Sequence, residues 1–156
     1  MLDKIKTFFD TFFAASDEAT ASVEHQLNLA AAALLLEMSA QDQKVSEQEI
    51  ATVRQALLAH LDVSEHELDE LYQLAQEEKQ EATDYHQFTR LIAEHYDQDK
   101  KVHLVELLWR VAFADAELDK YEEQMVRKIC DLIYVPHRDY LQTKLRVMEE
   151  LGIDSP

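Results

Sequence analysis

The chain has 156 residues, with 15 lysines and arginines against 32 aspartates and glutamates, so its formal net charge at pH 7 is −17. This length suits one domain with its own core, and two independent domains would be cramped. A charge of this sign repels nucleic-acid backbones and anionic lipid, so we expect no nucleic-acid partner and favour cations or basic protein surfaces.

The counts of cysteine and glycine limit the possible cellular compartments and fold classes. The single cysteine, Cys130, cannot form an internal disulfide, and we find neither a cleavable signal pattern nor an apolar run that could span a bilayer. We therefore expect a cytoplasmic protein. Only one glycine and two prolines are present. Because hairpins and phosphate-binding loops need glycine, the composition predicts an all-α protein, a compact bundle of about seven to eight helices.

The first predicted helix lies within residues 1–15, where the apolar side chains form one stripe. We expect this stripe to pack on the core of the domain. A helix that contacts a membrane surface or a partner is the alternative. Residues 16–22 are a small polar linker, which divides the chain into an N-terminal helix with its linker, residues 1–22, and a helical domain, residues 23–156. The residues of the stripe are Leu2, Ile5, Phe8, Phe9, Phe12 and Phe13.

The later helices are predicted from apolar spacing and from capping residues. An Ala-rich helix at about residues 23–40 is apolar nearly all round and is expected to be central. Helices follow at about 65–80, 85–95, 98–114 and 120–134, and the last one has Pro136 in its first turn and ends near Leu151, before Gly152. Several begin with a capping box, in which a side chain at each end satisfies a free backbone amide. The boxes are Ser46 with Glu49, Ser64 with Glu67, Asp84 with Gln87 and Asp119 with Glu122, while Asp97 caps the helix that follows it.

An internal repeat relates two parts of the chain. A shift of 73 residues (107 − 34) aligns "LLLEMSAQDQKVSEQEIATVRQAL", which starts at Leu34, with "LLWRVAFADAELDKYEEQMVRKIC", which starts at Leu107. The polar matches, such as Asp42 with Asp115, are harder to attribute to composition than the apolar ones. We infer two copies of a helix–connection–helix unit, arranged about a pseudo-two-fold axis.

These residues resemble the TerB family of tellurite-resistance-associated helical domains, in particular its small stand-alone bacterial members. The resemblance rests on "LLWRVAFADAELDKYEE", on the earlier copy "LLLEMSAQDQKVSEQE" and on the tail "VPHRDYLQTKLRVME", and it covers about residues 24–150. It implies a compact helical bundle, an association with bacterial stress or metal-oxyanion resistance, a metal-binding or protein-scaffolding role, and no established enzymatic activity.

The acidic connections of the two copies are the candidate functional site. Asp115, Glu117 and Asp119 have the spacing of the first ligands of a calcium loop, but Lys120 and Val126 stand where that loop needs glycine and glutamate, which excludes a self-sufficient EF-hand. If the pseudo-two-fold axis brings both connections together, their carboxylates form one pocket for a weakly bound divalent cation such as calcium, magnesium or manganese. The predicted ligands are Asp42, Glu49, Asp115, Glu117, Asp119 and Glu122.

Helix capping is the competing interpretation of the same residues. It explains Ser46, Glu49, Asp119 and Glu122 without a metal, but it leaves the acidic residues between the helices unexplained. No histidine has the neighbours of a di-iron or zincin site, and Cys130 falls on an apolar stripe. We therefore predict a non-enzymatic interaction or scaffold domain with a protein partner. A metal-dependent enzyme or a metal-sequestering protein that uses the acidic residues is the alternative.

Overall fold

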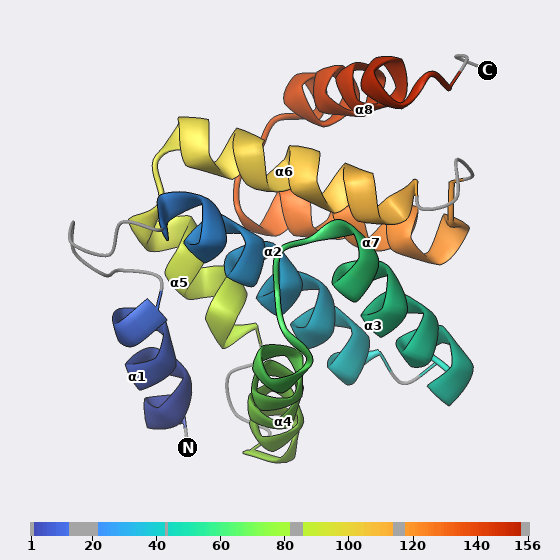
Figure 1. Cartoon of the computed structure of the whole chain (residues 1–156). Helices are drawn as coiled ribbons and strands as arrows, with labels where there is room; N and C mark the ends of the chain where they lie inside the picture. The colour runs from blue at the N-terminus through green and yellow to red at the C-terminus, as the bar shows by residue number, and fades with distance from the viewer. Residues whose placement is uncertain (1, 13–21, 43, 82–85, 114–117, 154–156) are drawn as a thin grey trace.

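The computed structural model describes residues 2–12, 22–42, 44–81, 86–113 and 118–153, and every regular element in these ranges is an α-helix (Figure 1). The prediction of an all-α bundle is thereby confirmed. In the same ranges, no helix is both long and apolar enough to cross a membrane. The helices are α1 Leu2–Phe12, α2 Ser22–Gln41, α3 Glu47–His60, α4 Glu65–Glu81, α5 Gln87–His95, α6 Gln98–Ala112, α7 Lys120–Leu132 and α8 His137–Leu151.

Helix α2 forms the centre of the bundle, as its composition predicts. Every residue from Leu27 to Ala40 is buried. The alanines in this run carry small side chains, which let neighbouring helices approach closely, and α2 packs against α3, α4, α5, α6 and α7. Helix α8 lies on the outer side of α6 and α7, at the opposite end of the molecule from α1 and α4 (Figure 1).

Helix α1 packs on the body of the domain. Ile5 and Phe8 are buried, and the ring of Phe8 meets that of Phe88 on α5 edge-on, with 6.2 Å between the ring centroids. Lys4 adds an ion pair of 3.4 Å with Glu77 on α4. These contacts agree with the expected burial of the apolar stripe, while contact of α1 with a membrane surface stays a prediction.

Most predicted helix ends are confirmed by their caps. At the start of α3, the Glu49 amide donates to Ser46 Oγ at 3.1 Å and the Ser46 amide donates to Glu49 Oε1 at 3.0 Å, which completes the capping box. Ser64 forms the same box before α4. Asp97 caps α6, and Gly152 ends α8 with a φ of 73°, in the left-handed region that favours glycine.

The predicted start of α5 is wrong. This helix begins at Gln87 rather than near residue 85, because His86 has a φ of 66° and interrupts the helical backbone. His86 supplies no side-chain cap, and the Gln87 amide instead donates to Glu78 Oε2 on α4 at 2.6 Å. Asp84, the predicted cap, lies outside the described residues. The Glu78 carboxylate of α4 therefore satisfies the Gln87 amide that the sequence assigned to the Asp84 side chain.

Candidate functional site

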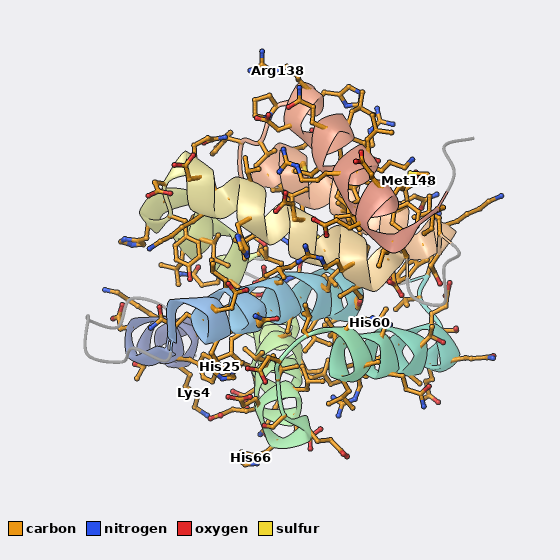
Figure 2. The ribbon with its side chains drawn as sticks, turned by 45° about the horizontal axis from the view of Figure 1, so that its top comes forward. Lys4, His25, His60, His66, Arg138 and Met148 are labelled. Atoms are coloured by element: carbon orange, nitrogen blue, oxygen red, sulfur yellow. The ribbon has the colours of Figure 1, made fainter. Side chains whose placement is uncertain are left out.

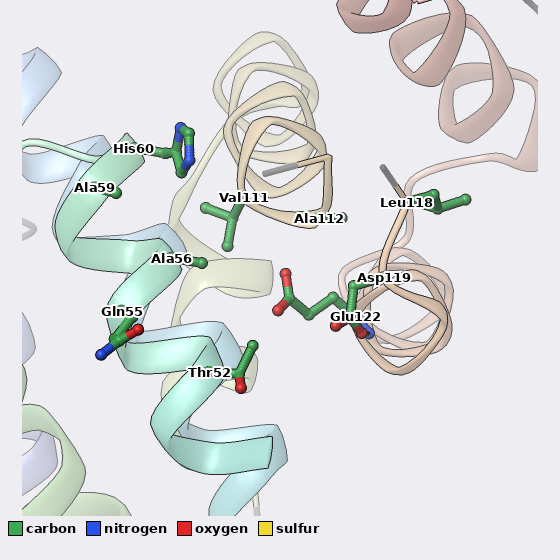
Figure 3. A pocket seen from close by; sticks show the side chains of 10 residues that line it. All are labelled: Thr52, Gln55, Ala56, Ala59, His60, Val111, Ala112, Leu118, Asp119 and Glu122. Carbon is green, nitrogen blue, oxygen red and sulfur yellow. Dashed lines mark hydrogen bonds between the residues drawn. The ribbon is translucent and has the colours of Figure 1, made fainter. Parts of the chain in front are cut away.

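A cavity of about 480 Å³ lies between α3 and the ends of α6 and α7 that face it (Figure 3). Helix α3 supplies one wall, because residues three or four apart in a helix share a face. The small side chains of Ala56 and Ala59 on that face leave the space open. The lining residues are Thr52, Gln55, Ala56, Ala59 and His60 from α3, Val111 and Ala112 from α6, and Leu118, Asp119 and Glu122 from the start of α7.

Glu122 points from α7 across this cavity toward α3 (Figure 3). The residue keeps only 2% of its surface exposed, and no donor among the described residues reaches its Oε1. Burial, together with the nearby Asp119 carboxylate, raises the pKa of Glu122 to about 8. With no cation beside it, the side chain is therefore mostly protonated at neutral pH.

Only one of the two hydrogen bonds predicted for a capping box of Asp119 and Glu122 forms. The Glu122 amide does donate to Asp119 Oδ1, at 3.0 Å, so Asp119 caps α7 as predicted. The Asp119 amide, however, donates to the backbone carbonyl of Ala112 at 2.9 Å. Since that amide is already satisfied within the connection, the Glu122 carboxyl is free to turn into the cavity.

In the α2–α3 connection, the acidic side chains accept hydrogen bonds mainly from the backbone of the connection itself. Asp42 Oδ1 accepts from the Lys44 amide at 2.9 Å, and Glu49 accepts from Ser46 in the capping box. Tyr121 of α7 lies beside this connection. Burial raises the pKa of Tyr121 to about 12; the Ser39 side chain partly offsets this rise, and the carboxylates of Asp42 and Glu49 add to it. The start of α7 is thus close to the α2–α3 connection.

The six predicted cation ligands are only partly placed by the structure. Asp115 and Glu117 lie outside the described residues. Asp42, Glu49 and Asp119 each accept a backbone amide of their own connection, whereas Glu122 faces the cavity. Over the ranges the structure describes, no group of three or more His, Cys, Asp or Glu residues is arranged to hold a metal ion. The cation site and the pseudo-two-fold axis stay predictions.

A second pair of carboxyl groups was not anticipated from the sequence. Glu37 on α2 and Glu78 on α4 are buried beside the N-terminus of α5. Glu37 accepts from the Phe88 amide at 2.8 Å, from the Thr89 amide at 3.0 Å and from the Thr89 hydroxyl at 2.6 Å. Burial first, and then the neighbouring Glu78, raise the pKa of Glu37 well above its ordinary value.

Glu37 and Glu78 stabilise the start of α5 and do not form an open site. Both Glu78 oxygens accept hydrogen bonds, one from the Gln87 amide and one from the Gln41 side chain at 2.8 Å. The available signal in the sequence was the glutamate within "LLLEM", because an acid inside an apolar helix needs buried donors. The positions of those donors, on a helix some 50 residues away, depend on the fold.

Comparison with known families gives one finding. Residues 28–145 match the family described as tellurite resistance protein TerB. This span contains α3 to α7 whole, both acidic connections and all residues that line the cavity. No curated protein and no solved structure matches the chain.

Proposed function

Since the chain belongs to the TerB family, which is associated with tellurite resistance, we propose that it is a non-enzymatic interaction domain of a bacterial stress or tellurite and metal resistance response. Domains of this family are generally non-catalytic. The chemistry of Cys130 supports the same conclusion, because burial raises the pKa of its thiol to about 12 and removes it as a nucleophile.

The outer face of α8 is the observation that supports docking to a protein. The helix packs inward through Tyr140, Val147 and Met148, whereas Leu141 and Leu145 are 43% and 53% exposed. Exposed leucines four residues apart form a continuous apolar strip on the helix. A partner that covers this strip removes both side chains from water, which favours binding.

Basic residues flank this apolar strip on an otherwise acidic molecule. Arg138 lies at the outer edge of the molecule, at the start of α8 (Figure 2), and makes no ion pair within the described ranges. Arg146 is exposed next to Leu145 and pairs with Glu106 of α6. The chemistry of this face fits a partner with acidic side chains around an apolar centre.

A comparison of two double variants tests the proposal. Arg138→Glu with Leu145→Ser reverses the charge and removes the apolar contact of the α8 face. The control, Lys6→Glu with Leu58→Ser, makes the same changes at exposed positions on α1 and α3. In quantitative affinity capture from the native cell extract, we expect the α8 variant to lose a defined protein by about tenfold or more and the control to retain it. Equal recovery of that protein with both variants contradicts docking through α8.

The cation site is a separate part of the proposal. We propose that the acidic connections bind calcium, magnesium or manganese weakly, through Asp42, Glu49, Asp119 and Glu122 together with Asp115 and Glu117. Calorimetric titration with each ion tests this. Weak binding that Asp115→Asn abolishes supports the site, and the absence of both heat and a rise in Tm rejects it. Micromolar binding that the same variant abolishes favours the metal-dependent enzyme or sequestering protein instead.

A further inference from the structure

The carboxyl group of Glu122 has hydrogen-bonding capacity that the described part of the chain does not use. Its Oε1 is buried without a donor, in a cavity of about 480 Å³. Native proteins rarely leave a buried polar atom unpaired, because the lost hydration costs about 1–3 kcal/mol. An unpaired oxygen on a side chain that lines a cavity is a position where a ligand can supply the missing donor.

The walls of the cavity define the shape of that ligand. Ala56, Val111 and Ala112 are buried and apolar, while Thr52 and Gln55 are exposed on the rim. The volume lies within the range of about 300–1,000 Å³ that small-molecule sites occupy. An alkyl chain fits against the alanines and the valine, and a donor at its end reaches Glu122.

The charges around the cavity define the ligand's polar end. Among the lining residues that the structure describes, Asp119 is the second acidic one, and none is a lysine or arginine. An anionic group is therefore repelled. A cation is favoured by the Asp119 carboxylate and by the net charge of −17, and a cation placed beside Glu122 lowers the pKa of that residue and so favours its ionised form.

An ammonium group fits better than a metal ion or a guanidinium. Among the described lining residues, Asp119 Oδ1 is already engaged with the Glu122 amide, so these residues alone offer fewer oxygens than the six or more ligands that a hard cation needs. A guanidinium is a planar fork that pairs best with two free oxygens, whereas one orphaned oxygen matches the compact charge of an ammonium.

We propose that this cavity binds a primary ammonium group on an alkyl chain, with the Glu122 carboxylate as its direct partner. The same chemistry occurs in free aliphatic amines and in the lysine side chain of another protein. The site lies between α3 and α7 rather than on α8, so its test and the test of docking through α8 fail independently.

Heteronuclear NMR titration at constant pH and ionic strength tests the proposal. The probes are n-butylammonium chloride as the free amine and Nα-acetyl-lysine N-methylamide as the lysine side chain. The matched uncharged ligand is n-butanol. We expect the amide signals of Gln55 and Glu122 to shift saturably with n-butylammonium, and n-butanol to bind about tenfold or more weakly.

Three variants identify the site. Glu122→Gln removes the ionisable carboxyl group with little change in shape, and Ala59→Leu fills the cavity from an exposed position without touching the carboxyl group. Both should weaken binding of n-butylammonium by about tenfold or more. Glu94→Gln makes the first change on the exposed surface of α5 and should leave binding unchanged.

Each outcome decides the proposal. Saturable binding of n-butylammonium with this pattern of variants supports it, and binding of the lysine compound then shows whether a protein can be the source. Absence of saturation with both ammonium compounds overturns it, as does binding that Glu122→Gln leaves intact. Magnesium shifts that depend on Glu122, without binding of either amine, also overturn it and make the cavity a metal site.

Discussion

At the scale of single residues, His25 links α2 to the start of α4. It lies beside α4 (Figure 2), with Nε2 2.9 Å from Glu67 Oε2 and Nδ1 3.6 Å from Asp62 Oδ2. Burial lowers the pKa of His25, but the two carboxylates outweigh burial and raise it above the ordinary value of 6.5. Because the folded pKa is the higher one, this contribution to stability is complete below pH 6.5 and is lost as the pH rises through the folded value.

We therefore predict a pH-dependent effect of His25→Gln. The variant should lower the free energy of unfolding by about 0.5 kcal/mol near pH 6 and change it little near pH 9. The expected effect is small because solvent screens the ion pair at this partly exposed site. Urea denaturation at both pH values measures this. His66→Gln, at an exposed position next to Glu67, is the control and should have no such pH dependence. An equal loss for His25→Gln at both pH values contradicts the ion-pair account.

Glu49 and Glu122, which the predicted repeat places at equivalent positions, show what the sequence could predict. Glu49 and Glu122 follow a cap residue by the same three positions, and the capping box was correct for Glu49. It was wrong for the side chain of Glu122, because the Asp119 amide bonds to the Ala112 carbonyl. That bond depends on the path of the connection, which local spacing does not specify. The cavity could not be predicted from the sequence either, because small residues leave a gap only once the helices around them are placed.

At the scale of helices, local capping sets the start of α3. Ser46 Oγ accepts a hydrogen bond from the Glu49 amide, one of the amides of the first turn. We predict that Ser46→Ala lowers the free energy of unfolding by about 1 kcal/mol. Thr52→Ala, at an exposed position inside the same helix, should change it by less than about 0.5 kcal/mol. Chemical denaturation of both variants compares them, and a loss no larger for Ser46→Ala speaks against the cap.

Tertiary capping sets the start of α5, which explains why its boundary was not predictable. Glu37→Ala removes the acceptor of the Phe88 and Thr89 amides and leaves both buried. We predict a loss of about 3 kcal/mol in the free energy of unfolding, together with faster hydrogen exchange of these two amides. Glu94→Ala, exposed on α5, is the control and should change neither by much. Unchanged exchange in Glu37→Ala contradicts the capping role.

At the scale of the molecule, the excess of 32 acidic over 15 basic residues makes the folded chain repel itself. Ion pairs such as Arg110 with Glu150 offset only part of this excess. Because salt screens repulsion between surface charges, we predict that Tm rises by a few degrees between about 0.05 and about 0.5 M sodium chloride. Calorimetry at fixed protein concentration measures it. A fall in Tm over this range shows that attractive pairs dominate instead.

The overall architecture was predictable because its signals are local and repeated. The near absence of glycine, the apolar run of α2 and the motifs of the two connections predicted an all-α bundle and its family, and the match over residues 28–145 confirms that family. Functional surfaces depend on which helix ends meet and which faces stay uncovered. The exposed strip of α8 is an example, because Leu141 and Leu145 resemble core leucines in the sequence.

Site-specific photo-cross-linking in the native cell tests whether this domain docks to a partner protein through α8. A photoreactive amino acid replaces Gln142, which is exposed between the two leucines, and in a matched strain it replaces Ala51, which is exposed on α3. Docking through α8 predicts a discrete cross-linked protein from position 142 that is absent from position 51. No discrete product from position 142, or the same products from both positions, would contradict it.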